Sequence, residues 1–272
     1  MPDQNEHVVY PNPSVAHVVL EVRFPPTLVD GAEAAAGLRT GLRERFPLVD
    51  QVHPALAFGP SDTGAMPVMN SMLRHQSRDR SQTVAVLPEV VIVETSSYLG
   101  FDWYLEFIRG PLDVIASVLQ PDAVLTIGHR FIDEVRVPDI NGLLDWSEWI
   151  DPCLVTPGQL PSAAGLSEPA EWQGSAVYRM DSDTSLTLRY GPQNAPTVIP
   201  TTSELQRPAP AGPFFLLDWD SRWTPTTAPE FTADEVILGC QKLYAPVRAM
   251  YHHLTSDRLR AVFSDDTPGA TR

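Results

Sequence analysis

Residues Val15–Phe24 have the sequence VAHVVLEVRF, in which every even-numbered position is apolar. The odd-numbered positions include His17, Glu21 and Arg23. Successive side chains of a β-strand point to opposite faces of the sheet, so this alternation gives one face that packs on a core and one that stays polar. The stretch predicts a half-buried strand, which ends at Pro25 and Pro26 because proline donates no backbone hydrogen bond.

Six further segments carry the alternation or the β-branched residues typical of strands. They are Met72–Asp79, Gln82–Thr95, Val124–Val137, Ser175–Asp181, Ser185–Tyr190 and Phe214–Asp220. Within the third of these, Gly128 predicts a β-bulge. Two proline-rich segments, Pro47–Pro67 and Gly191–Pro213, predict long irregular connections.

Five segments have the three- or four-residue spacing or the capping residues of helices. They are Asp30–Phe46, Phe101–Leu119, Leu143–Trp149, Thr232–Leu254 and Ser256–Phe263. The fourth begins with a capping box formed by Thr232 and Glu235. Because proline clashes with the carbonyl four residues back, Pro111 predicts a kink or a division into two short helices, and Pro246 predicts a bend.

The order of these elements favours the α+β class. Strands that follow each other through hairpins as well as helices indicate a mostly antiparallel sheet, or sheets, with helices packed on one face and long Pro-rich loops. Residues 8–264 are expected to form a single structural unit, or else two α+β lobes at 8–140 and 141–264. Residues 265–272 are expected to be a flexible tail.

Composition excludes several classes of protein. The chain has 272 residues, 43% hydrophobic and 19% charged, which is typical of a globular protein. Apolar runs such as Val90–Val93 and Phe214–Leu217 are far shorter than the ~20 residues that span a bilayer. The N-terminal residues lack the features of a secretory signal. We therefore expect a cytoplasmic protein that does not enter a membrane.

The net charge of the chain limits the classes of molecule that it can bind. The formal net charge is -15, with 34 acidic residues against 19 basic ones. Direct nucleic-acid binding is not expected, because neutralising phosphates needs a concentrated cationic surface. The acidic surface favours a basic protein partner, or serves solubility alone. Cys153 and Cys240 are too few for a thiolate metal site, and no cofactor or metal is predicted.

Common catalytic motifs are absent from the sequence, including G-x-G-x-x-G, G-x-S-x-G and H-E-x-x-H. Four residues remain as candidates for acid–base catalysis: His129, Asp133, Asp218 and Asp220. His129 and Asp133 share a strand face, and Asp218 and Asp220 are near them if the two strands are neighbours. Arg130 is a candidate ligand-binding residue, although alternation places it on the opposite face, where an acid would pair with it.

Two arginine pairs are candidates for binding an anion or an acidic partner. Arg39 and Arg43 are four apart on a predicted helix, and Arg74 and Arg78 are four apart on a predicted strand. The alternative for each pair is ion pairing with neighbouring carboxylates. Three tryptophans are candidate interface anchors, with core packing as the alternative; they are Trp149, Trp172 and Trp223.

Six segments together resemble a sporadically distributed bacterial protein family of about this length whose function is uncharacterised. They are HVVLEVRFPP, MLRHQSRD, YLGFDW, LTIGHRFIDEVRVP, FFLLDWD and LYAPVRAMYHHLTSDRLRAVF. The resemblance runs from Tyr10 to Phe263. The run His129–Asp133 is similar to the family's Arg-Tyr-Ile-Asn strand signature, with Phe131 in place of tyrosine and Asp133 in place of asparagine. The resemblance implies no enzyme activity or cofactor, and the family's patchy distribution is typical of defence and toxin–antitoxin genes.

Two functions follow as hypotheses. The first is a non-enzymatic protein-binding component of a bacterial defence or toxin-neutralising system. The second is a small-molecule-binding protein or an unusual enzyme, with a pocket between the sheet and the helices. The sequence does not determine the oligomeric state.

Overall fold

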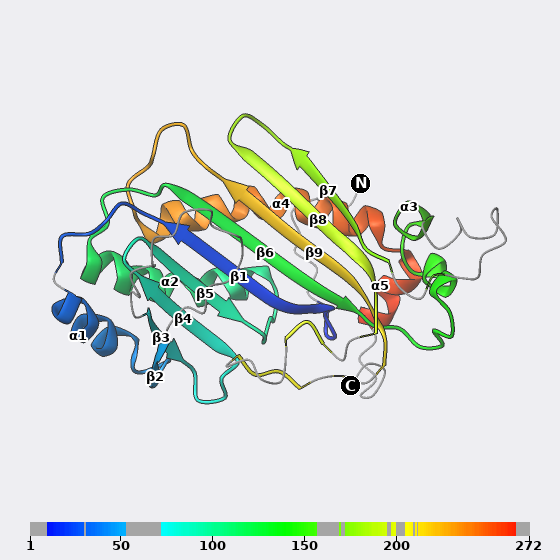
Figure 1. The fold of residues 1–272 in the computed structure, drawn as a ribbon, viewed down its shortest axis with the longest axis horizontal. Helices are drawn as coiled ribbons and strands as arrows, with labels where there is room; N and C mark the ends of the chain where they lie inside the picture. The colour runs from blue at the N-terminus through cyan, green and yellow to red at the C-terminus, as the bar shows by residue number, and fades with distance from the viewer. Residues whose placement is uncertain are drawn as a thin grey trace, which may run out of the picture.

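The computed structural model describes residues 10–29, 31–52, 72–156, 169, 172–194, 197–199, 205–208, 210 and 212–264. These residues form a nine-stranded sheet with the strand order β2-β3-β4-β5-β1-β6-β9-β8-β7 (Figure 1). Every neighbouring pair is antiparallel. The strands are β1 Val15–Arg23, β2 Leu48–Val52, β3 Met72–Gln76, β4 Gln82–Leu87, β5 Val90–Thr95, β6 Thr126–Val135, β7 Gly174–Arg179, β8 Thr184–Gln193 and β9 Phe214–Trp223.

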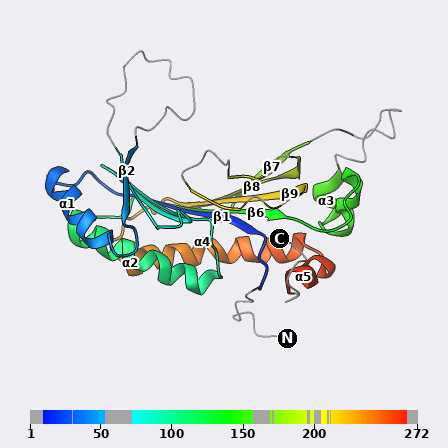
Figure 2. The same cartoon turned by 90° about the horizontal axis from the view of Figure 1, so that it is seen from below.

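The longer helices cover one face of this sheet. Figure 2 shows α2, α4 and α5 below it, with α1 at one end beside α2 and α3 at the other end. Their bounds are α1 Gly31–Leu42, α2 Phe101–Leu119, α3 Pro152–Val155, α4 Ala233–Leu254 and α5 Asp257–Ser264, and a 3-10 helix spans Leu143–Glu148. The predicted α+β class is confirmed. Among the described residues, none of the helices is both long and apolar enough to cross a membrane.

The centre of the sheet is the pair of strands whose alternation is clearest in the sequence. Val18, Leu20 and Val22 of β1 face the helices and are fully buried. β1 pairs with β6, with Leu20 opposite His129, and β6 pairs in turn with β9. The sheet is therefore continuous across the two halves of the chain. We call the opposite face, which carries His17, Arg130, Glu134 and Asp218, the polar face.

Several predicted elements need correction. The predicted single strand Gln82–Thr95 is two strands, β4 and β5, joined by a turn at Pro88 and Glu89. Proline cannot donate to the ladder, so the chain reverses there. Residues 48–52, predicted to be irregular, form β2 because β3 offers them a pairing edge. The remainder of Pro47–Pro67, residues 53–67, lies outside the described residues, as do 265–272.

The prolines inside the two long helices do not divide them. α2 continues from Phe101 to Leu119 through Pro111, and α4 continues through Pro246. Pro111 is buried together with Phe107 and Leu112, so tertiary packing offsets the loss of the hydrogen bond that this proline cannot donate. Of the two outcomes expected at Pro111, a division into two short helices is therefore wrong.

The start of α4 offers a test of the predicted capping box. Thr232 is the N-cap, and its Oγ1 accepts a hydrogen bond of 3.1 Å from the backbone N–H of Glu235. Replacing Thr232 by Ala is expected to lower the free energy of unfolding by about 1 kcal/mol, because that N–H loses its acceptor. Thr232→Ser keeps the acceptor and should retain most of the stability in a urea titration. Equal losses in both variants would contradict the capping role.

Candidate functional site

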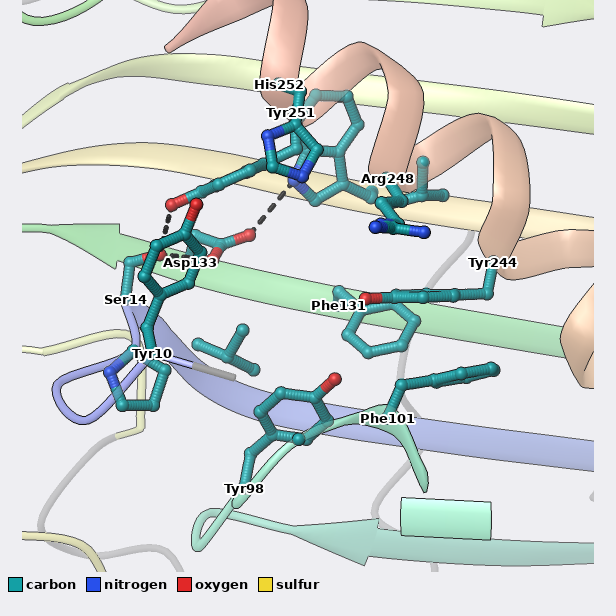
Figure 3. A pocket seen from close by; sticks show the side chains of 15 residues that line it. Tyr10, Ser14, Tyr98, Phe101, Phe131, Asp133, Tyr244, Arg248, Tyr251 and His252 are labelled. Carbon is teal, nitrogen blue, oxygen red and sulfur yellow. Dashed lines mark hydrogen bonds between the residues drawn. The ribbon is translucent and has the colours of Figure 1, made fainter. Parts of the chain in front are cut away.

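A pocket of about 80 Å³ lies between α4 and the central strands (Figure 3). We call it the α4 pocket. Its lining comes from the segment before β1, the segment before α2, and from β6, β9 and α4. The lining residues are Tyr10, Pro13, Ser14, Val15, Tyr98, Gly100, Phe101, Phe131, Asp133, Trp219, Tyr244, Val247, Arg248, Tyr251 and His252.

One face of α4 supplies five of these residues. Tyr244, Val247, Arg248, Tyr251 and His252 lie at spacings of three, one, three and one. Side chains at these spacings share one side of an α-helix, one turn above the other. The spacing of these polar and aromatic residues is visible in the sequence, but by itself it indicates only the core face of a helix.

Asp133 lies in the wall of the α4 pocket and is buried, with 2% of its surface exposed. Ser14 Oγ donates a hydrogen bond of 2.6 Å to its Oδ1, and Trp219 Nε1 donates one of 3.0 Å to its Oδ2. The Tyr251 hydroxyl is 3.0 Å from Ser14 Oγ. Since the Ser14 proton goes to Asp133, Tyr251 is the donor to Ser14. A chain of three side chains therefore ends at the carboxylate.

The strand β1 begins with an irregularity that places Ser14. The register between β1 and β6 shifts between Val15 and His17, where Val15 lies opposite Asp133. Gly128 pairs regularly with Glu21, so the bulge predicted at Gly128 is wrong. Bulges change the direction of neighbouring side chains. Here the irregularity is next to Ser14, which reaches the Asp133 carboxylate.

Burial raises the pKa of Asp133 from 3.8 to about 6. The hydrogen bonds from Ser14 and Trp219 act against that shift, and the Asp218 charge adds to it. Near neutral pH the carboxyl therefore carries most of a negative charge inside a largely apolar site. Such a group attracts a positive charge or takes up a proton readily.

Aromatic rings form the walls of the α4 pocket. Phe131 lies 5.4 Å from Tyr244 and 6.0 Å from Tyr98 between ring centroids, and Phe101 stacks on Tyr244 at 3.7 Å. Burial raises the pKa of the Tyr98, Tyr244 and Tyr251 hydroxyls. These phenols stay protonated and act as neutral hydrogen-bonding groups.

Arg248 brings a positive charge to the same pocket. It lies on α4 one turn after Tyr244. Burial raises the pKa of Tyr10 and of Tyr244, and the charge of Arg248 acts against that rise; for His252 the charge of Arg248 adds to a lowering of the pKa. For His252 the larger cause is burial, which also lowers its pKa. His252 is therefore neutral at pH 7, and Asp133 and Arg248 are the charged residues that line the pocket.

The predicted acid–base constellation is not brought together. His129 shares the face of Asp133, as expected, but it is buried under Tyr104, with ring centroids 5.3 Å apart. Burial lowers its pKa to about 3, so it is a neutral core residue outside the pocket lining. Asp218 and Asp220 lie on the polar face, because they alternate with Trp219. Of the four candidates, Asp133 alone lines the α4 pocket.

Arg130 also lies on the polar face, as alternation predicted. Its Nε and Nη2 donate hydrogen bonds of 2.7 and 2.8 Å to the two oxygens of Asp218. Arg189 is 3.2 Å from the same carboxylate and 3.6 Å from that of Asp220. Arg130 therefore links β6 to β9 in an ion-pair network, and it does not line the α4 pocket.

The two arginine pairs do not form one cluster. Arg39 is exposed on α1, and Arg43 is exposed in the turn just after α1 ends at Leu42. α1 lies against α2 on the helix-covered side of the sheet. Arg74 is half-buried on the polar face, beside His17 and Glu94. Arg78 lies beyond the end of β3 and is exposed. The sheet separates the first pair from Arg74, so the four residues cannot bind one small anion together.

The three tryptophans make contacts within the chain. Trp149 is buried, with 4% exposed, and the Arg258 guanidinium lies 4.0 Å from its ring centroid, so it is not a surface anchor. Trp172 packs edge-on against Tyr190 and Phe215. Trp223 Nε1 donates a hydrogen bond of 3.3 Å to Asp183. Trp172 and Trp223 are half-buried.

A search of the described residues finds no group of three or more His, Cys, Asp or Glu side chains that could hold a metal ion. The fold and the site thus define an α+β protein with an aromatic pocket between its sheet and one helix. Protein-family models give no match to the chain, and neither do the curated proteins.

Proposed function

We propose that this protein binds a small polar molecule in the α4 pocket. The observation that carries the proposal is the buried Asp133 carboxylate, which lines a cavity walled by aromatic rings. Burying a charge costs free energy, and an apolar side chain would stabilise this part of the core better. Ligand sites in proteins are typically apolar cavities with a few oriented polar groups, which is the composition found here.

The geometry favours binding over catalysis. Ser14 donates its proton to Asp133, but a carboxylate with a pKa of about 6 is a far weaker base than an alkoxide. Asp133 therefore does not activate Ser14 as a nucleophile. His129, which is buried and neutral, does not reach the pocket to serve as the base.

Protein binding in a defence or toxin-neutralising system stays a prediction. The even acidic charge supports it, while the tryptophans proposed as anchors are engaged in contacts within the chain. A basic partner would be recognised by the surface and a small molecule by the α4 pocket, so both properties are compatible in one protein.

A fragment screen tests the proposal. Ligand-observed NMR with small polar compounds is expected to detect millimolar binders of the wild-type protein. Val247→Phe places a ring in the cavity and should abolish their binding, because Val247 lines the pocket. The control Leu238→Phe is on the same helix, where Leu238 is 60% exposed, and should bind as the wild type does.

The shifted amide signals give a second readout. They should map to α4, to β6 and to the residues around Ser14. This readout uses the wild-type protein and therefore does not require that any variant folds. Absence of binders, or binders that shift only distant amides, would refute the α4 pocket as the site.

A further inference from the structure

The α4 pocket carries one residue of each charge, Asp133 on β6 and Arg248 on α4. We infer that its ligand is a small zwitterion, with a methylated ammonium group beside Asp133 and the aromatic rings and an anionic group at Arg248. This inference rests on the proposed function of the α4 pocket and adds the chemical class of the ligand.

The hydrogen bonds of Asp133 leave its negative charge available to a cation. Both oxygens of Asp133 accept hydrogen bonds, but the donors, Ser14 and Trp219, are neutral. Neutral donors orient the carboxylate without compensating its charge. A positive group in the cavity would compensate it at short range, where water is largely excluded and the attraction is strong.

The walls favour a methylated ammonium over a primary one. A primary ammonium has three N–H donors that each need an acceptor, whereas Asp133 already accepts two hydrogen bonds and much of the lining is ring carbon. A methylated ammonium spreads its charge over C–H groups. Tyr98, Phe131 and Tyr244 line the cavity, and the quadrupole of an aromatic ring attracts such a cation.

Arg248 would bind the anionic end of the ligand. Arg248 lines the cavity from α4, and its charge acts on Tyr10 and Tyr244. A guanidinium offers a planar set of donors that matches a carboxylate or phosphate. A single water molecule needs roughly 10–15 Å³ of cavity volume. A pocket of about 80 Å³ therefore suits a compound of the size of an amino acid.

Four probes of matched shape separate the two charges. Glycine betaine carries both, choline carries the cation, 3,3-dimethylbutanoate carries the anion, and 3,3-dimethylbutan-1-ol carries neither. Dissociation constants are measured by NMR titration at pH 7.5. Glycine betaine is expected to bind tightest, with 3,3-dimethylbutanoate weaker by about tenfold or more, because a tert-butyl group has the same shape without the charge.

Two variants assign the charges to residues. Asp133→Asn should markedly reduce the preference for glycine betaine over 3,3-dimethylbutanoate, because only the aromatic rings then favour the cation, and Arg248→Gln should reduce its preference over choline. Arg258→Gln is the control, because Arg258 is exposed and pairs with Glu148 outside the pocket. It should leave all four constants unchanged. Circular dichroism confirms that each variant is folded.

The outcomes separate this inference from the proposed function. If 3,3-dimethylbutanoate binds the wild type as tightly as glycine betaine, or if Asp133→Asn keeps the preference, the zwitterion inference is wrong while the pocket remains a ligand site. The same holds if none of the four probes binds but other fragments do. If neither the probes nor any fragment binds, both proposals fail.

Discussion

Replacing Glu134 by Gln is expected to lower the free energy of unfolding by about 3–5 kcal/mol. The Glu134 side chain is fully buried on the polar face, and its Oε2 is 3.0 Å from Arg136 and 2.6 Å from Arg207. Breaking a buried ion pair leaves the remaining charges without compensation, which costs more than the pair contributes. Here two guanidinium groups would lose their carboxylate at once.

The other oxygen of Glu134 holds a separate segment of the chain. Its Oε1 accepts hydrogen bonds of 2.6 Å from Thr197 Oγ1 and 2.7 Å from the backbone N–H of Val198. Burial acts to raise the pKa of Glu134, but these hydrogen bonds and Arg207 outweigh it and lower the pKa. Glu134 therefore fastens two stretches, at 197–198 and at Arg207, to the sheet, and both should loosen in the variant.

Urea denaturation with Glu148→Gln as the control measures this effect. Glu148 pairs with Arg258, but both side chains are more than half exposed. An exposed pair contributes about 0–1 kcal/mol, so the control should be nearly as stable as the wild type. A Glu134→Gln variant with the stability of the control would show that the cluster on the polar face is energetically unimportant.

The elements that the sequence predicts well are those whose signal is local. β1 and β6 alternate over long stretches, and α4 combines an N-cap threonine with a regular apolar spacing. β2 and the division between β4 and β5 are not predicted, because pairing partners decide them. β2 depends on the edge of β3, and β4 and β5 pair with each other through the turn after Leu87.

The candidate site is predictable only in part. Alternation places Asp133 on the buried face and Arg130 on the other, which the register of β6 confirms. Ser14 is 119 residues from Asp133, and Tyr251 is 237 residues from Ser14. No local pattern links such distant residues, and the sheet order that joins them comes from tertiary packing. Glu134 escapes prediction for the same reason, since Arg207 and Thr197 are far along the chain.

The stability of the wild-type protein should fall as the pH rises through the pKa of Asp133. That pKa is about 6 in the folded chain and 3.8 for an unperturbed aspartic acid, so the folded state binds this proton more tightly than the unfolded state does. The stabilising contribution is complete below pH 4 and is lost as the pH rises past 6. Its full size is about 3 kcal/mol. The charged or titratable groups that line the pocket with Asp133 are Tyr10, Tyr98, Tyr244, Arg248, Tyr251 and His252, and Asp218 acts on it from the polar face.

Asp133→Asn isolates this contribution from the other titrating groups. The amide can accept from Trp219 and donate to Ser14, whose hydroxyl then turns toward Tyr251, so the hydrogen bonds of the buried cluster persist without a charge. The difference in unfolding free energy, wild type minus variant, should therefore decrease by about 2.5 kcal/mol between pH 4 and pH 7.5. His252 titrates in both proteins, and its effect largely cancels in the difference. Denaturant titrations of both proteins at four or five pH values measure this difference. Parallel curves of unfolding free energy against pH would show that Asp133 is not in a low-dielectric environment. Such a carboxylate would not be the group that attracts a cationic ligand.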